Sequence, residues 1–394
     1  MWSYGAFGLV ILCASFWVGD LMNSKTKGII SGLLTASIIY IAGYLTGIIP
    51  TTQPADLGFS GIIPVYGLLL IVANLGTMVS LNDLLKQWKT VVICLASLVM
   101  MAFTIATVGS LAFGREIAWL AIAPISGGAV ACTMVSDVAV AAGREDLAAF
   151  PMLLNVVQLL FGVPVSSFFV KKYCYKAVAA GEHLSYVESN NASVKKINLQ
   201  IIPPIPDSKN TKHLILAKLA VVALASTWIN KISGGKIPAA IVALLLGIIL
   251  TEVGFLDRNS LQKSGFYEFL MFTFMAYLVS SFSSLTAERL KSFIVPMVGL
   301  LLIGVVSLAL GSMLMGKVLK VDWRLAAALG PAAMFGYPFS QLLCEDVVRE
   351  MHLPKDEADK MLKIVMPQLV IAGFCTVTLA SVFVAGIVGP MIFK

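Results

Sequence analysis

Long apolar runs separated by short polar stretches make up most of the chain. Six runs precede a polar stretch at residues 171–212, and six more follow it. Most of them approach the ~20 residues that a transmembrane helix needs. The pattern therefore predicts an all-helical protein that crosses a membrane many times. The runs cover residues 3–22, 28–49, 61–80, 90–113, 117–143, 149–170, 213–230, 237–255, 266–285, 292–315, 323–347 and 364–392.

Composition supports a membrane protein and excludes several other classes. The chain has 394 residues, of which 58% are apolar and 12% charged, whereas soluble chains carry roughly 25% charged residues. A soluble enzyme, a disordered chain and a secreted disulfide scaffold are therefore excluded. The net charge of +7 comes mainly from lysines and arginines in short loops, which set topology rather than bind nucleic acid. The six cysteines show no metal-ligand spacing, so we expect no metal site.

Several features recur in the same order before and after residues 171–212. The third run of each set ends in Ser-Leu, the fifth is interrupted by glycine or proline, and the sixth carries an early glutamine. This order indicates an internal duplication, as in many transporters. The matched features are Ser80-Leu81 with Ser284-Leu285, Ser126-Gly127-Gly128 with Gly330 to Pro338, and Gln158 with Gln368.

The distribution of lysine and arginine predicts how the runs cross the membrane. If all twelve runs span, the positive charges divide 13 inside and 15 outside. If the two interrupted runs enter and return to the same side, the division becomes 21 inside and 7 outside. The second arrangement follows the positive-inside rule. A continuous helix over 116–143 would also measure about 42 Å, longer than the ~30 Å apolar core of a bilayer.

The predicted fold class is an all-α polytopic membrane protein with two inverted repeats of about five transmembrane helices. Each repeat contains one glycine-interrupted segment, which is re-entrant or an unwound spanning helix. The expected parts are an N-terminal repeat at 1–172, a cytoplasmic linker at 173–212 and a C-terminal repeat at 213–394. Both termini are expected outside the plasma (inner) membrane. Because Lys25 and Lys27 follow the first run, it is expected to be a membrane span rather than a cleavable signal peptide.

The candidate site lies at the two interruptions, because irregular backbone within a membrane is tolerated where it is buried in protein or lines a wet cavity. Asp137 is the one carboxylate placed well inside a predicted membrane segment, and such residues are often functional. Together with Ser126 and Thr133 it lies on one face of a helical arm, at i, i+7 and i+11. The predicted anion-binding residues are Ser126, Gly127, Gly128, Gly336, Ser340, Gln341 and Gln368, and the predicted cation-binding residues are Thr133, Asp137, Asn155 and Gln158.

The sequence also resembles a known family. The motif Ile125-Ser126-Gly127-Gly128 and the stretch Leu159 to Pro164 are similar to those of the glutamate–sodium symporter family and its 2-hydroxycarboxylate relatives. That family usually reads Gly-Gly-x-Gly, whereas Val130 occupies the fourth place here. The resemblance implies sodium-coupled uptake of an amino acid, such as glutamate, or of a carboxylate. It also implies that both re-entrant loops form the site.

The leading hypothesis is a secondary active transporter that moves a small organic anion together with Na⁺. No enzyme motif, P-loop or channel filter is evident, so we expect neither catalysis nor a cofactor, and only the lipid bilayer and the transported species as partners. A homodimer is left open. One alternative is a proton-coupled exchanger or exporter in which Asp137 titrates. Another is a non-transporting membrane subunit or receptor that needs a soluble partner.

Overall fold

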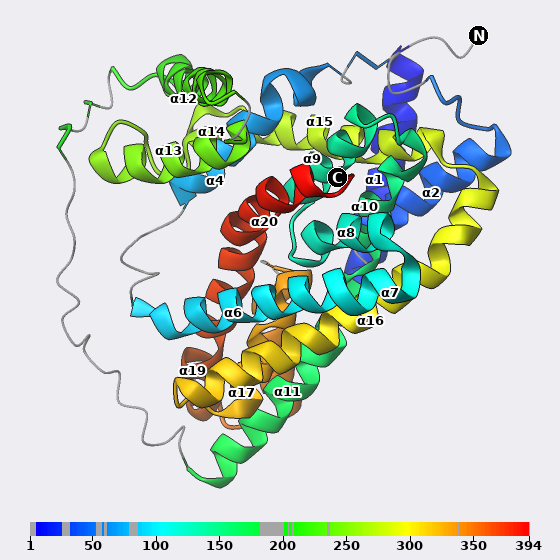
Figure 1. Cartoon of the computed structure of the whole chain (residues 1–394). Coiled ribbons are helices and arrows are strands. Elements are labelled where there is room, and N and C mark those ends of the chain that lie inside the picture. The colour runs from blue at the N-terminus through cyan, green and yellow to red at the C-terminus, as the bar shows by residue number, and fades with distance from the viewer. Residues whose placement is uncertain are drawn as a thin grey trace. The chain divides into compact units, whose positions relative to one another are not determined.

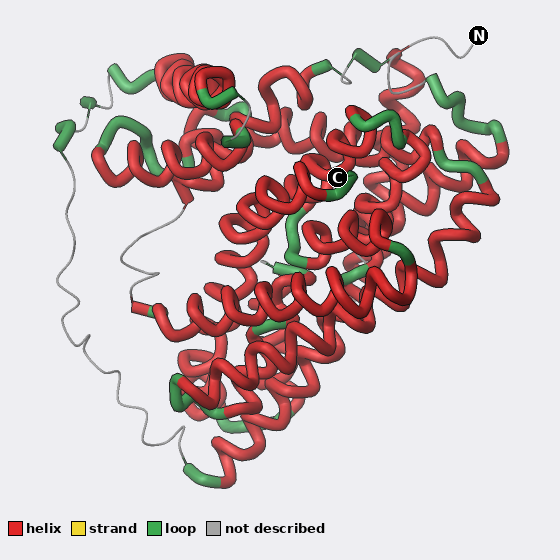
Figure 2. The backbone as a smooth tube through the Cα atoms, viewed as in Figure 1, coloured by secondary structure: helices red, strands yellow, loops and turns green. Residues whose placement is uncertain are grey.

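The computed structural model describes residues 5–25, 32–52, 57–58, 61–78, 86–181, 201–203, 205–206, 209–234, 237–336 and 339–393. Every regular element in these ranges is a helix (Figure 2). Six helices in these ranges are long and apolar enough to cross a membrane. The predicted all-helical polytopic class is confirmed at this level. Part of the predicted linker lies outside the described residues. So does Tyr337, a polar residue of the second interruption.

The chain forms two compact units, and each combines segments from both halves of the sequence. Unit 1 comprises residues 1–18, 35–83 and 195–285, and unit 2 comprises 19–34, 84–194 and 286–394. Neither unit coincides with a predicted sequence repeat. The division at 173–212 stays a prediction; in the described residues one helix extends to Ala179 and the next begins at Lys212.

Unit 1 contains helices from the beginning and the middle of the chain. Its closest helix packing joins α4 to α13, where a methyl group on Gly76 would come within 2.6 Å of the Leu244 carbonyl oxygen. The side chain of Asn74 accepts a hydrogen bond from the Leu261 backbone N–H at 2.9 Å. Its elements are α1 (Gly5–Lys25) to Val18, α2 (Gly32–Thr46) from Thr35, η1 (Ile63–Gly67), α4 (Leu68–Met78), α12 (Lys212–Ile232), α13 (Ala239–Val253), α14 (Ser260–Ser264), α15 (Tyr267–Ser280) and η3 (Ser281–Ser284).

Unit 2 holds both glycine-interrupted segments and the long helices that pack against them (Figure 1). Its elements are α6 (Trp88–Thr104), η2 (Ile105–Gly109), α7 (Ser110–Phe113), α8 (Arg115–Ile125), α9 (Ala129–Ala141), α10 (Glu145–Val157), α11 (Leu159–Ala179), α16 (Ala287–Val318), α17 (Trp323–Leu329), η4 (Pro331–Met334), α18 (Phe339–Glu350), α19 (Lys355–Phe374), η5 (Cys375–Ala380), α20 (Ser381–Val388) and η6 (Gly389–Met391).

A group of ion pairs, which we call the first ionic cluster, gathers several helix ends of unit 2. Arg144, between α9 and α10, pairs with Glu116 in the first turn of α8 and with Asp146 at 3.1 Å. Arg289, near the start of α16, pairs with the same Asp146 at 3.1 Å. Arg115 donates a hydrogen bond to the Met391 carbonyl at 3.3 Å. The starts of α8, α10 and α16 therefore lie close to the ends of α9 and η6.

A second ionic cluster joins the end of α11 to the two ends of the other interrupted segment. Lys171 pairs with Glu350, the last residue of α18. Lys176 pairs at 3.5 Å with Asp322, which caps the start of α17. The hydrogen bond from Lys171 holds the pKa of Glu350 below its usual value, so this carboxylate keeps its charge to lower pH than a free glutamate does.

Each interrupted segment therefore folds back on itself. The segment from Arg115 to Arg144 begins and ends in the first ionic cluster, and α10 packs against both α8 and α9. The segment from Asp322 to Glu350 begins and ends in the second, and α11 packs against both α17 and α18. We call α8–α9 the first hairpin and α17–η4–α18 the second hairpin. A straight helix would separate the ends of either segment by about 42 Å.

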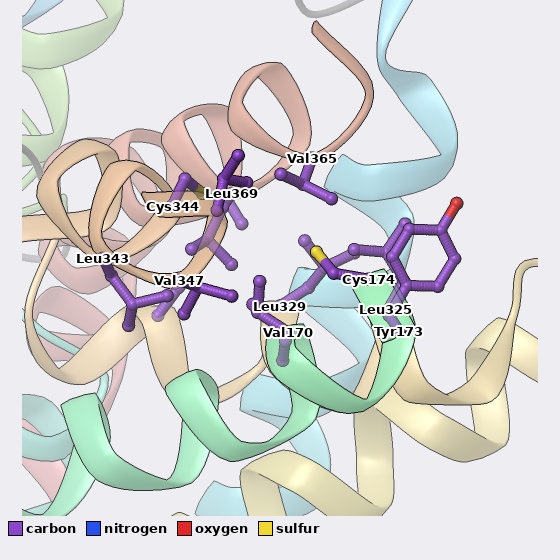
Figure 3. Close-up of a cluster of buried hydrophobic side chains, with 14 of the residues drawn as sticks. Val170, Tyr173, Cys174, Leu325, Leu329, Leu343, Cys344, Val347, Val365 and Leu369 are labelled. Carbon is purple, nitrogen blue, oxygen red and sulfur yellow. The ribbon is translucent and has the colours of Figure 1, made fainter. Parts of the chain in front are cut away.

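An apolar core holds the second hairpin between α11 and α19 (Figure 3). Val170 and Cys174 of α11 lie in the same buried cluster as Leu329 of α17, Leu343 of α18 and Leu369 of α19. Truncating one such buried leucine to alanine costs about 2–5 kcal/mol. Burial of these side chains therefore stabilises the hairpin along its length, and the ion pairs secure its ends.

We predict that cysteines replacing Glu116 and Arg144 cross-link efficiently through a short bifunctional maleimide, because their side chains are paired across the hairpin base. The background carries Cys13→Ser, since Cys13 is exposed and the five other cysteines are buried. Mass spectrometry of the digested protein detects the link.

The control replaces Glu116 and Lys171 with cysteine. Glu116 lies beside the start of α10 through its pair with Arg144. Roughly 40 Å of helix runs from there to Lys171 along α10 and α11, so cysteines at positions 116 and 171 should not react with one linker. Linkage of the control, or none between positions 116 and 144, would contradict the hairpin.

Candidate functional site

The tips of the two hairpins cross with their backbones in contact. A methyl group on Gly127 would overlap the Ala333 carbonyl oxygen of the second hairpin. A methyl group on Gly128 would come within 2.5 Å of the Val377 carbonyl oxygen in η5. Both glycines have positive φ angles, +103° and +86°, which side chains larger than hydrogen disfavour. Glycine is therefore required at this tip for both conformation and space.

The second tip is equally close to its neighbours. Gly336 has a φ of +63°, and a methyl group there would lie 2.9 Å from the Val377 side chain. A methyl group on Gly373 of α19 would lie 3.0 Å from the Gly336 Cα atom, and one on Gly162 of α11 would lie 2.7 Å from the Met334 Cβ atom. Sequence reasoning missed Gly162, Gly373 and Val377. The available signal was a glycine about one turn beyond each matched glutamine.

The two long helices beside the tips are themselves interrupted. Gln158 separates α10 from α11, and α19 passes into the π-helix η5. A π-helical turn changes the regular hydrogen-bonding pattern and is frequent at functional sites. Four interruptions therefore occur along the segments that pack together in the interior of unit 2.

Ser126 and Thr133 are fully buried on the first hairpin. Each hydroxyl donates to the carbonyl oxygen three residues earlier, at 2.7 Å: Ser126 to Ala123 and Thr133 to Val130. Their hydrogen atoms are thus used within their own segments. What they still offer is an oxygen lone pair, which suits a cation or a hydrogen-bond donor.

Six buried side-chain oxygens have no hydrogen-bond partner among the described residues: those of Ser37, Tyr44, Ser110, Gln158, Asn210 and Ser340. Two of them, in Gln158 and Ser340, belong to segments beside the hairpin tips. Gln158 is 3% exposed; its Nε2 donates to Asn155 Oδ1 at 3.3 Å, but its Oε1 has no partner. Ser340, in the first turn of α18, is fully buried, and its Oγ has no partner. Buried polar groups are nearly always satisfied by protein, water or ligand. The oxygens of Gln158 and Ser340 are therefore available to a species bound beside the tips.

Gln341 and Gln368, also predicted for the site, form hydrogen bonds within their own helices. Gln341 donates to Glu345 at 2.8 Å, and Gln368 donates to the Ile364 carbonyl at 3.1 Å. Asp137 is half-buried on α9 and interacts with another residue. The structure brings Gly127, Gly128 and Gly336 together at the crossing, and Ser126 and Ser340 adjoin it in sequence. It does not bring the side chains of Gln341 and Gln368 to the crossing, because they bond to Glu345 and Ile364.

Helix ends supply the electrostatics of the crossing. α9 begins after Gly128 without a side-chain cap, and α18 begins at Phe339 beside the second tip. α8 ends at Ile125 and η4 at Met334. The crossing thus has partly positive N-termini and partly negative C-termini. None of the fully buried side chains in the described ranges is charged, so these partial charges can bind a small ion of either sign.

Comparisons with known proteins do not place the chain in a family. No family model matches it, and no curated protein matches its sequence. The resemblance to the glutamate–sodium symporters thus rests on the quoted motifs. Among solved structures, one similar fold is the sodium proton antiporter MjNhaP1 from Methanocaldococcus jannaschii, with 14% identity, 99% of this chain and 98% of that chain covered, and a TM-score of 0.37. A likeness this weak carries no conclusion about function.

We predict that Gly128→Ala is much more destabilising than Gly114→Ala. The two glycines share a φ of +86° and each precedes a helix, but a methyl group on Gly114 meets nothing within 4 Å. Backbone strain is therefore matched, and only Gly128→Ala adds overpacking of about 1–3 kcal/mol. Thermal unfolding in detergent measures the difference. Equal melting temperatures would show that Gly128 is not in close contact with η5.

Proposed function

We propose that this chain is a secondary active transporter that binds a small organic anion and Na⁺ where the two hairpin tips cross. The observation that carries the proposal is the backbone contact between two glycine-broken hairpins, with unpartnered oxygens of Gln158 and Ser340 in the same interior. Irregular backbone within a membrane is tolerated where it is buried in protein or lines a cavity. Paired helix breaks of this kind are a common way to build a transporter site.

The directions of the long helices support an inverted repeat within unit 2. The continuous helical stretch from α6 to α7 ends at Phe113, next to the first ionic cluster. α16, in contrast, begins at that cluster, because Arg289 in its first turn pairs with Asp146. α10 begins at that cluster through Asp146, whereas α20 and η6 end there through Met391. Corresponding elements of the two proposed repeats thus run in opposite directions. This antiparallel relation suits alternating access to a central site from the two membrane faces.

The helix ends favour an anion as one bound species. The free N–H groups at the N-terminus of a helix attract negative charge, and α9 and α18 have 13 and 12 residues. An amino-acid or carboxylate substrate would place its carboxylate at these ends. The glycines would allow that carboxylate to approach the backbone directly.

The oxygen-rich neighbours favour a small cation as the second species. Ser126, Thr133 and Gln158 present oxygen atoms whose lone pairs are available, and the fully buried residues in the described ranges include no carboxylate. Neutral oxygens can coordinate Na⁺ without a protonation step. A proton-coupled mechanism is the second candidate, and it would have to use the half-buried Asp137.

We predict that Na⁺ and one organic anion together raise the melting temperature of the purified protein. At 100 times the dissociation constant, a ligand adds about 2.7 kcal/mol of stability. Gln158→Leu should lose this shift at little cost to the ligand-free protein, because removing the buried oxygen without a partner offsets the lost hydrogen bond to Asn155. The control, Gln262→Leu, changes an exposed glutamine of unit 1 and should keep the shift. An anion effect indifferent to both Na⁺ and Gln158 would contradict the proposal.

We predict that Asp137→Asn leaves pH-independent, Na⁺-driven uptake into proteoliposomes within several-fold of the wild type. The reason is that sodium coupling at neutral oxygens needs no titrating carboxylate. Uptake of the identified anion is measured with a sodium gradient and then with a proton gradient alone. Loss of proton-driven uptake in Asp137→Asn, with sodium having no effect, would establish the proton-coupled alternative instead.

A further inference from the structure

One end of unit 1 carries an exposed basic surface beside two exposed isoleucines. α12, α13 and α14 form this region (Figure 1). Four exposed cations lie on it or on the loops beside it: Lys209, Lys212, Arg258 and Lys263. We call these four residues, together with Ile201 and Ile202, the basic–isoleucine surface.

The backbone holds the two isoleucines at the end of α13. The N–H groups of Ile201 and Ile202 both donate to the Val253 carbonyl oxygen at 3.0 Å, at the C-terminus of that helix. The position of these residues is therefore set by hydrogen bonds to the end of this helix. Even so, Ile201 is 79% exposed and Ile202 is 36% exposed. The backbone of these two isoleucines is fixed, but their side chains are exposed, so their apolar area is available to a partner.

The carboxylates near this surface lie beneath the cations. Asp257 accepts from Asn210 at 3.0 Å and pairs with Lys218 at 3.5 Å and Lys263 at 3.9 Å. Its side chain is 20% exposed, whereas that of Lys263 is 53% exposed. Negative charge is thus recessed, and a partner approaching from outside meets the lysine first.

The same relation holds for the second acidic group. Glu252 pairs with Arg258 at 2.7 Å; the glutamate side chain is 8% exposed and the arginine side chain is 45% exposed. Lys209 and Lys212 flank Thr211, which caps α12 by accepting from Leu214 N–H at 3.3 Å. The outward-facing charge of the surface is therefore positive, and apolar side chains lie next to it.

We propose that the basic–isoleucine surface binds the headgroups of anionic phospholipids, with Ile201 entering the acyl region of the same leaflet. Lysine and arginine next to apolar side chains are the combination that binds an anionic membrane interface. An acidic peptide would satisfy the cations but would leave the isoleucines exposed. The proposal does not depend on transport, because it concerns the resting protein in its bilayer.

The first experiment compares thermal stability of the whole chain in two nanodiscs, one of phosphatidylcholine and one containing phosphatidylglycerol. We expect a higher melting temperature with phosphatidylglycerol, and loss of most of that gain in the double variant Lys209→Gln, Lys212→Gln. The control Lys231→Gln removes an exposed cation from the other end of α12 and should keep the gain. Inorganic phosphate added to phosphatidylcholine discs should not reproduce it. An equal gain in the wild type and the double variant would overturn the proposal.

The second experiment tests the position of Ile201 directly. In the Cys13→Ser background, a fluorophore on Ile201→Cys should be quenched several-fold more strongly by lipids brominated in their acyl chains than one on Gln262→Cys. Gln262 is an exposed polar residue of α14 and serves as the matched water-facing position. Equal, weak quenching at both positions would show that Ile201 faces water and would overturn the insertion. Strong quenching by an added acidic peptide that carries a bromine or spin label, but not by brominated lipid, would indicate a protein partner and would overturn the proposal.

Discussion

The backbone contact between the two hairpin tips is the constraint on which the rest of unit 2 depends. Gly127 meets the Ala333 carbonyl, Gly128 meets the Val377 carbonyl, and Gly336 lies against the Val377 side chain. These contacts leave no space for a side chain on Gly127 or Gly128. The neighbouring long helices are interrupted as well, at Gln158 and at η5. A packed interior cannot absorb even one additional methyl group without cost.

The hairpins are secured by two different kinds of interaction. Their sides rest on apolar packing, as in the cluster joining Val170, Leu329 and Leu369. Their ends rest on ion pairs around Asp146, at the start of α10, and around Asp322, beside the last part of α11. Exposed ion pairs contribute little stability individually. Their effect here is to fix positions, since each cluster holds together helix ends that are distant in sequence.

The polar interior combines satisfied and unsatisfied groups. Ser126 and Thr133 use their hydrogens on nearby carbonyls, whereas Gln158 Oε1 and Ser340 Oγ have no partner among the described residues. Leaving a buried polar atom unpaired costs about 1–3 kcal/mol. Retaining two of them is reasonable where a bound ion or substrate completes their hydrogen bonding. Under the proposed function, these are the two oxygens that a species bound at the crossing would contact.

Much of the fold could be read from local patterns. Run length and composition indicate helices that span a membrane, and Ser126-Gly127-Gly128 marks a break because glycine permits conformations that other residues avoid. Charge counting favoured segments that return to the side they entered, and the Arg144–Glu116 pair brings the ends of one such segment together. These features depend on neighbours in sequence or on the membrane as a solvent, both of which a single sequence records.

Only the tertiary structure decided which groups meet. Gly162 and Gly373 each follow a matched glutamine by about one turn, but that spacing does not say what they contact, and Val377 has no such signal. Their roles come from contacts with segments distant in sequence. Gln341 and Gln368 looked equivalent to Gln158 by residue type, yet they bond to Glu345 and to a backbone carbonyl. The sequence by itself determined the helices and their breaks. Packing decided which breaks face one another and which polar atoms remain available, because those depend on the three-dimensional approach of separate segments.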